Sequence, residues 1–176
     1  RERIRAETAR RPPAGRARGT AAAAAATDDR FAKGLADGLL AKEMAALLVE
    51  LCGFADVRAD VKLPGLGVEL HLVAADRAGH EWAFEVVGAL TNNRTGLKRA
   101  DALWRALGRA AVVHEGRPDL PFVLITTDRP GRGSAGRRAL EAVSGPGRPV
   151  FDTIELFDAA DRDRLTGHAR QGAPAP

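Results

Sequence analysis

Cysteine is nearly absent from this sequence, which has one such residue, Cys52, among its 176 residues. A single cysteine cannot form a disulfide within the chain, and its place at the end of an apolar helical pattern is typical of a buried, reduced residue. We therefore expect a cytoplasmic protein whose fold does not depend on disulfides. Arginine outnumbers lysine, and alanine and glycine are abundant, which is typical of GC-rich bacterial coding sequences.

Long apolar runs are missing as well. No stretch reaches the roughly 20 residues needed to span a bilayer, and Ala21–Ala26 is too short and too weakly apolar for the core of a signal peptide. The segment RPGRGSAGRR (129–138) lacks the Gly-Lys-Ser/Thr ending of a P-loop and the spacing of a dinucleotide-binding loop. No His and Asp are spaced around Ser134 as in a catalytic triad, so we interpret Ser134 as a helix cap.

An excess of positive charge is confined to one end of the chain. The net charge is +4 and the isoelectric point is about 10.0, but residues 1–30 contain eight Arg and four acidic residues. Residues 31–176 therefore carry equal numbers of basic and acidic side chains. A surface that binds nucleic acid must then come from local clustering of cations.

The length suits one globular domain. We expect a disordered, basic and Ala-rich tail over residues 1–28, a single domain over 29–170 and a disordered tail over 171–176. Apolar periodicity within the domain predicts helices and strands in the order α-β-β-β-α-β-α-β-α. They span residues 30–52, 57–63, 67–75, 81–89, 96–113, 121–128, 135–144, 149–158 and 159–169. This order predicts an α/β (α+β) fold whose central mixed sheet is flanked by helices.

The predicted helix over 96–113 has one apolar face. That face carries Leu97, Ala100, Trp104, Leu107 and Ala111. Thr95 is the expected N-cap. We expect Trp104 in the core in preference to a base-stacking role.

Glu85 interrupts an otherwise apolar strand, EWAFEVVGA (81–89). A buried carboxylate is costly unless it is paired, metal-bound or protonated. The turn Arg77-Ala78-Gly79 matches a three-residue hairpin with a left-handed last position, which sets Glu85 opposite His71. Glu69 then lies on the same face of the hairpin. Carboxylate oxygens suit Mg²⁺ or Mn²⁺, and an added imidazole favours Mn²⁺ or Zn²⁺. The alternative is a solvated face on which Glu85 bonds a nearby donor.

The stretch VELHLVAADRAGHEWAFEVVG, followed by a helix and a strand, resembles the PD-(D/E)XK nuclease superfamily, which has the restriction-endonuclease-like fold. The resemblance covers residues 30–128 and implies an αβββαβ core with a Mg²⁺ or Mn²⁺ site. The acid of the family's acid-x-Lys triplet falls on Glu85, and the lysine position holds Val87. The second-strand Asp falls on His71, for which Glu69 or Asp76 can substitute.

The same resemblance implies two further groups. The family lysine sometimes moves to the following helix, where Lys98 lies, with Arg94 just before it. A glutamate of the first helix often contributes, and here Glu43 or Glu50 is available. We also expect Arg94, Lys98 and Arg99 to contact phosphate at the start of the helix, and Arg132 to contact DNA from its loop.

These observations predict a divalent-metal-dependent DNA endonuclease of the restriction or repair type. Glu85, Lys98 and Glu43 are its expected catalytic residues, and Glu85, Glu69, His71 and Asp76 its metal ligands. The alternative is a catalytically degenerate module of the same fold that binds DNA or a protein partner. A homodimer, or a partner protein from a restriction or repair system, is compatible with either hypothesis.

Overall fold

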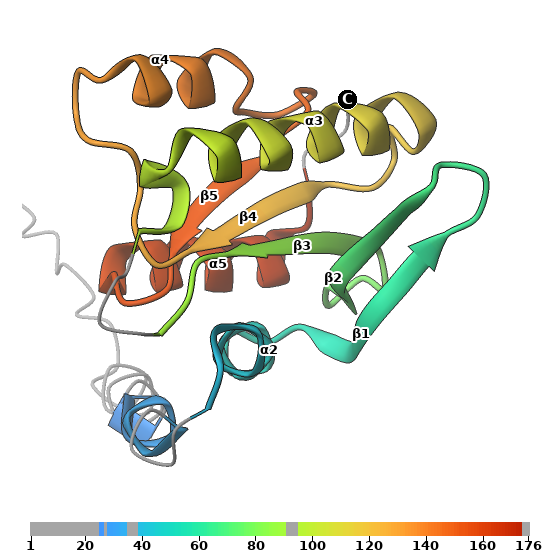
Figure 1. The fold of residues 1–176 in the computed structure, drawn as a ribbon. Helices are drawn as coiled ribbons and strands as arrows, with labels where there is room; N and C mark the ends of the chain where they lie inside the picture. The colour runs from blue at the N-terminus through green and yellow to red at the C-terminus, as the bar shows by residue number, and fades with distance from the viewer. Residues whose placement is uncertain (1–24, 27, 35–38, 91–94, 174–176) are drawn as a thin grey trace, which may run out of the picture.

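A mixed β-sheet forms the centre of the molecule, with helices on both faces (Figure 1). The computed structural model describes residues 25–26, 28–34, 39–90 and 95–173. The strands are β1 (Ala55–Leu63), β2 (Val68–Ala75), β3 (Glu81–Val87), β4 (Phe122–Thr126) and β5 (Asp152–Glu155). The helices are α2 (Ala41–Leu51), the short 3-10 helix η1 (Gly96–Lys98), α3 (Ala100–Gly116), α4 (Ala135–Ala142) and α5 (Ala159–Gln171).

The five strands lie in the order β1-β2-β3-β4-β5. β1, β2 and β3 form an antiparallel meander, whereas β3, β4 and β5 run parallel. Parallel neighbours need a crossover connection, which α3 supplies between β3 and β4 and α4 between β4 and β5. The predicted α+β class, mixed sheet and element order are confirmed.

Two apolar cores lie on opposite faces of the sheet. α2 and α5 cover one face, where Trp82 and Phe84 of β3 are buried, and α3 and α4 cover the other (Figure 1). Ala83, between those aromatic residues, belongs to the core under α3. This alternation follows from the two-residue period of a strand. Glu85, one period after Ala83, therefore belongs to the face of α3.

The hairpin between β2 and β3 has the predicted turn. Gly79 has φ +86°, and Asp76 donates its N–H to the carbonyl of His80 at 2.9 Å. The pairs from Ala75↔Glu81 to Leu72↔Phe84 follow the predicted register. The turn chemistry therefore set the register of this hairpin correctly.

The prediction of one helix over 30–52 is wrong. Residues 28–34 are helical, and a separate helix α2 begins at Ala41 after Leu40, which is extended (φ −72°, ψ 163°). Gly34 allows the helical residues 28–34 to lie close to α2. A Cβ at Gly34 would lie 2.9 Å from the Sδ of Met44.

The helix predicted over 96–113 also divides. Arg99 is extended (φ −77°, ψ 123°), so η1 ends before it and α3 begins after it, and the side chain of Thr95 makes no cap hydrogen bond. The buried face of α3 consists of Leu103, Ala106, Leu107, Ala110 and Val113. Trp104 is 61% exposed, so its predicted core position is wrong.

Two smaller predictions are confirmed. Ser134 caps α4 by accepting the N–H of Arg137 at 3.1 Å, and Cys52 is buried in the core under α2. Within the described residues, no helix is both long and apolar enough to cross a membrane. The tails predicted to be disordered lie largely outside the described residues, and α5 continues to Gln171.

Candidate functional site in the groove between β3 and α3

Strands β2 and β3 separate beyond the pair Leu72↔Phe84, while β3 continues beside β4 as far as Val87↔Thr126. The side chain of His71 fills the resulting fork. Its Nδ1 accepts the N–H of Val86 at 3.0 Å, which replaces a backbone ladder bond. The second half of β3 therefore pairs with a strand on one side only, where it lies beside β4.

Glu85 lies in this fork and is paired with an arginine of α3. Its side chain is 5% exposed, and its Oε1 accepts a hydrogen bond from Nη1 of Arg109 at 2.7 Å. The other terminal nitrogen of Arg109 donates to the backbone carbonyl of Glu69. Arg109 thus connects α3 with both β3 and β2.

The second oxygen of Glu85 is buried and makes no hydrogen bond of good geometry among the described residues, although the backbone N–H of His71 is near enough to lower the pKa of this carboxyl group. It lies 3.4 Å from Nδ1 of His71, but that nitrogen already accepts the Val86 N–H, so its lone pair is occupied. Such an unsatisfied buried oxygen favours the neutral carboxyl group. It also leaves one oxygen of Glu85 available to a ligand.

The protonation states follow from burial. Burial raises the pKa of Glu85 to about 7, although the charge and hydrogen bond of Arg109 act in the opposite direction. Burial, with the nearby charges of Arg109 and Lys42, lowers the pKa of His71. Near neutral pH the fork therefore contains a neutral imidazole, a permanent cation and a carboxyl group that can gain or lose a proton.

A groove runs from this fork along the first turns of α3, and we call it the β3–α3 groove. Its inner part is a cavity of about 250 Å³ lined by Glu85, His71 and Arg109, with backbone and small side chains of β3 and α3. The outer part is a cavity of about 640 Å³ that shares Val87 and Arg105 with the inner part. The groove therefore leads from the surface to Glu85.

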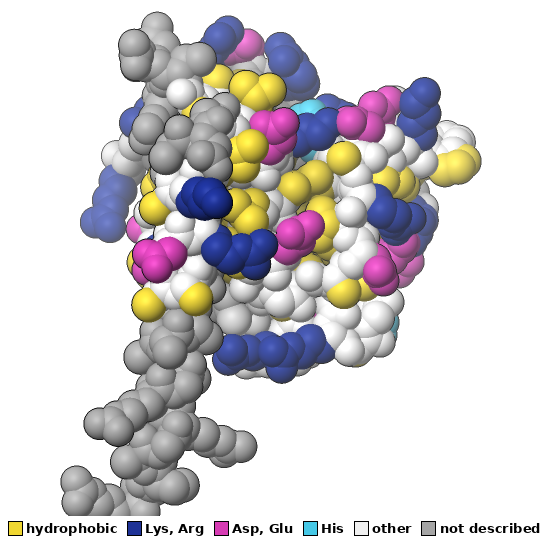
Figure 2. All heavy atoms as spheres, turned by 90° about the horizontal axis from the view of Figure 1, so that it is seen from below, with side chains coloured by type: hydrophobic (Ala, Val, Ile, Leu, Met, Phe, Trp, Pro, Cys, Tyr) yellow, Lys and Arg dark blue, Asp and Glu magenta, His cyan; other side chains and the backbone are white. Residues whose placement is uncertain are grey.

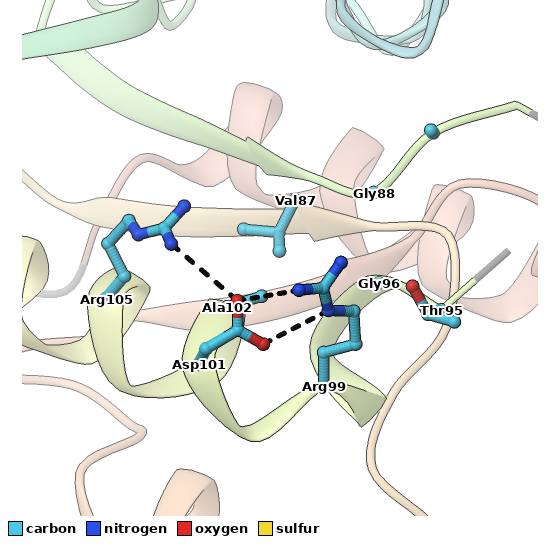
Figure 3. A pocket seen from close by; sticks show the side chains of 9 residues that line it. Val87, Gly88, Thr95, Gly96, Arg99, Asp101, Ala102 and Arg105 are labelled. Carbon is cyan, nitrogen blue, oxygen red and sulfur yellow. Dashed lines mark hydrogen bonds and ion pairs between the residues drawn. The ribbon is translucent and has the colours of Figure 1, made fainter.

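The outer part of the groove carries two arginines on either side of an aspartate (Figure 3). Arg99 donates to Asp101 from Nε at 3.1 Å and from Nη2 at 2.9 Å, and Nη2 of Arg105 lies 3.7 Å from the same carboxylate. The Arg99 guanidinium lowers the pKa of Asp101. Two guanidinium groups against one carboxylate leave the groove mouth positively charged.

Basic and acidic side chains are mixed on the face of the molecule below the sheet (Figure 2). On the face below the sheet, the described Lys and Arg side chains alternate with Asp and Glu (Figure 2). The groove mouth, where the cations exceed the carboxylate, is thus a better candidate for an anionic ligand than this lower face.

The cation predicted to act beside Glu85 is a different residue in the structure. Lys98 lies at the end of η1 and pairs with Asp128 at 2.8 Å, so it does not reach Glu85. Arg109 occupies that place instead. Arg94 lies outside the described residues, and Arg132 is exposed in the loop between β4 and α4.

The structure does not bring the other predicted carboxylates to Glu85. Asp76 accepts the N–H groups of Ala78 and His80 and the indole N–H of Trp82, so it stabilises the hairpin turn. Glu43 accepts the N–H of Leu40 at 2.7 Å and caps α2, which covers the opposite face of the sheet.

Glu69 is exposed, whereas Glu85 is buried. Of the four predicted metal ligands, only His71 and Glu85 lie together. Among the residues that the structure describes, no group of three or more His, Cys, Asp or Glu could hold a metal ion.

Arg109 could have been found from the sequence with the correct helix phase. One side of this helix carries two alanines and two arginines at helical spacing, namely Ala102, Arg105, Ala106 and Arg109. Small residues allow close approach of a helix to a sheet, and arginines beside them reach toward the strand. A helix phase with Trp104 on the apolar face directs Arg109 away from the strand, so that predicted phase hides this signal.

Comparisons with protein-family models, with curated proteins and with solved structures give no match for this chain. The fold defines an α+β domain with a five-stranded mixed sheet. Its candidate site is a carboxyl–arginine pair at the inner end of a cationic groove.

Proposed function

We propose that this chain is a restriction-endonuclease-like domain that hydrolyses phosphodiester bonds of DNA with Mg²⁺ or Mn²⁺. The order of its elements and the place of Glu85 in the third strand of the meander support this proposal. They agree with the resemblance of residues 30–128 to the PD-(D/E)XK superfamily. A cytoplasmic location and a role in restriction or repair belong to the same proposal.

The observation that carries the proposal is the unsatisfied oxygen of Glu85. Replacing a buried ion pair by apolar residues is often neutral or stabilising, so stability alone does not require a carboxyl group at this position. Glu85 nevertheless lies in an apolar strand with one buried oxygen lacking a partner, at a cavity. Unsatisfied buried polar atoms in native proteins call for a functional explanation, and ligand binding supplies one here.

The residues present fit a metal ion in part. Oε2 of Glu85 is a free carboxylate ligand when ionised, and Mg²⁺ is commonly held by one or two carboxylates together with substrate phosphate oxygens and water. A bound ion would lower the pKa of water and stabilise charge on the phosphate. Metal binding at this site is therefore expected to depend on the nucleic acid.

The protein's own cations would act on the phosphate. Arg109 is held in place by Glu85 and by the carbonyl of Glu69, and Arg105 stands one turn away on α3. Fixed guanidinium groups stabilise charge that develops on a phosphate. Arg109 would thus do what the displaced lysine was expected to do, with Val87 at the original lysine position.

A second candidate function is a nuclease-fold module that binds DNA, or a protein partner, without cleavage. The engagement of Glu43 and Asp76 in capping and turn hydrogen bonds favours it, as does the exposure of Glu69. Binding would then depend on Arg99 and Arg105 at the groove mouth. Both candidates use the same groove, so one experiment can separate them.

The test incubates the purified full chain with duplex and single-stranded DNA in Mg²⁺ or Mn²⁺. We expect cleavage by the wild type and a loss of at least about 100-fold in Glu85→Gln, because the variant removes the carboxylate that would hold the metal ion. Glu115→Gln is the matched control, since Glu115 is an exposed carboxylate of α3. It should cleave like the wild type.

The other outcomes decide between the candidates. Salt-dependent DNA binding without cleavage, retained in Glu85→Gln and weakened in Arg105→Ala, would establish the binding module and exclude the nuclease. Absence of both cleavage and DNA binding at low salt would reject the nuclease and the DNA-binding module.

A further inference from the structure

Trp104 is a large aromatic side chain on the outer surface of α3. The chain has two tryptophans; Trp82 is completely buried, whereas Trp104 is 61% exposed. Val112, two turns further along α3, is 44% exposed. Exposed aromatic surface is unfavourable in water, and tryptophan exposed beside cations is a frequent feature of ligand-binding surfaces.

Trp104 lies on α3 next to Asp101, which lines the outer part of the groove, although Trp104 itself is not part of that lining. It is three residues after Asp101, the carboxylate that holds Arg99 and Arg105, so the two positions are neighbours on the helix surface. Helical side chains lean toward the N-terminus of their helix, which directs the indole over the turn that contains Asp101. The exposed indole is therefore a neighbour, on the surface of α3, of the carboxylate that pairs with both guanidinium groups.

We propose that Trp104 stacks on an unpaired base of a nucleic-acid strand whose phosphates lie against Arg99 and Arg105, so that the groove takes single-stranded nucleic acid. This inference rests on the proposed function and specifies its substrate. Proteins that bind single strands combine a cationic groove along the backbone with aromatic side chains on which bases stack. Bases in an intact duplex are stacked on each other and do not present a free face.

The alternative occupant of this surface is a second copy of the chain, and the charges oppose it. A twofold contact of antiparallel α3 helices centred on Gly108 would face Asp101 of each copy with Glu115 of the other. Like charges placed opposite one another destabilise an interface. A nucleic-acid strand instead matches the positive mouth of the groove.

The first measurement is the tryptophan fluorescence of the full chain titrated with oligothymidylate at low salt. Because Trp82 is buried and Trp104 is exposed, quenching on binding reports stacking on Trp104. We expect quenching in the wild type and its loss in Trp104→Phe.

The second measurement is the affinity for labelled oligothymidylate and for a duplex, by fluorescence anisotropy. Trp104→Ala should weaken single-strand binding about 5- to 100-fold, and Trp104→Phe should weaken it less, because a phenyl ring still stacks. Val112→Ala, which truncates an exposed apolar residue of the same helix, should bind like the wild type. Thermal melting of each variant checks that it is folded.

Three results would overturn the inference. The first is an affinity for single strands that is unchanged in Trp104→Ala. If cleavage still depends on Glu85, or duplex binding on Arg105, this result overturns the inference and leaves the proposed function intact. Sedimentation showing a wild-type dimer that Trp104→Ala converts to a monomer would assign the surface to a second copy. A wild type that binds neither nucleic acid would remove the inference together with the proposed function.

Discussion

Glu85 carries the main electrostatic conflict of the molecule. Its burial favours the neutral form, while Arg109 at 2.7 Å favours the charged form. Burial prevails, and the pKa is raised from 4.5 to about 7. A carboxyl group whose pKa is raised by folding binds its proton more tightly in the folded chain than in the unfolded chain.

The free energy of unfolding should therefore depend on pH through Glu85. The folded chain holds the extra proton between pH 4.5 and about 7, so the contribution is present below this window and lost as pH rises through it. Its size is about 3 kcal/mol. Urea unfolding of the wild type and of Glu85→Gln, at about pH 5 and about pH 8, should show the variant gaining relative stability at the higher pH. If the difference in the free energy of unfolding between the two proteins were independent of pH, this would contradict the raised pKa of Glu85. His71 is present in both proteins, so its own titration contributes equally to each.

Asp76 supports a turn, and its replacement tests this role against a metal-binding one. Its carboxylate accepts three hydrogen bonds, from Ala78, His80 and Trp82. We expect Asp76→Ala to lower the free energy of unfolding by about 2–4 kcal/mol, because these donors lose an ionised acceptor. Metal-dependent activity measured well below the melting temperature should be unchanged. Loss of that activity with unaltered stability would instead make Asp76 a metal ligand.

At the scale of elements, the start of α3 depends on a close backbone approach. Gly96 has φ +41°, and a Cβ there would lie 2.5 Å from Oγ1 of Thr126 and 2.7 Å from the backbone nitrogen of Asp128. The N–H of Leu97 also bonds the Asp128 carbonyl at 2.9 Å. These contacts attach η1 to the end of β4 and thereby position the outer part of the groove.

Two glycine substitutions test this attachment. Gly96→Ala should lower the free energy of unfolding by about 2 kcal/mol or more, because the strained φ and the clash with backbone add. Gly108→Ala is the matched control within α3, where a Cβ would meet no atom within 4 Å. It should raise stability by about 0.5–1 kcal/mol through helix propensity. Equal denaturation midpoints for the two variants would show that η1 is not attached in this way.

At the scale of the whole molecule, α5 is held to the sheet by a buried carboxylate. Asp161 is 3% exposed. Its carboxylate oxygens accept hydrogen bonds from the side chain of Arg164 at 2.6 Å and from the backbone N–H of Glu155 at 2.7 Å. It also forms an ion pair with Arg129. The neighbouring Asp152 has its pKa lowered to about 2, mainly by hydrogen bonds from His168 and Arg164 that outweigh its burial. This network links β4, β5 and α5.

Removal of Asp161 should therefore loosen the layer beneath the sheet. Asp161→Ala leaves Arg129 without this buried partner, for which a loss of about 3–5 kcal/mol is expected. Asp163→Ala, an exposed aspartate two residues along α5, should change stability by less than about 0.5 kcal/mol. Thermal unfolding of both variants checks this, and similar melting temperatures would show that the network contributes little.

The sequence by itself determined the features that depend on neighbouring residues. The strands, the turn at Gly79 and the register of Glu81 with Ala75 follow from alternation and turn chemistry within a few residues. The cap at Ser134 has the same local origin. These interactions form between groups close in the chain, so a short window of sequence contains both partners.

Only the tertiary structure decided what surrounds Glu85. Arg109 lies 24 residues away and reaches it because α3 crosses the sheet in a phase set by the extended backbone of Arg99. In this orientation of α3 the side chain of Trp104 faces solvent. A helix can bury several overlapping faces at similar free energy, and packing against a sheet chooses between them. Glu85 was therefore recognisable from the sequence as a misplaced charge, but its partner was not.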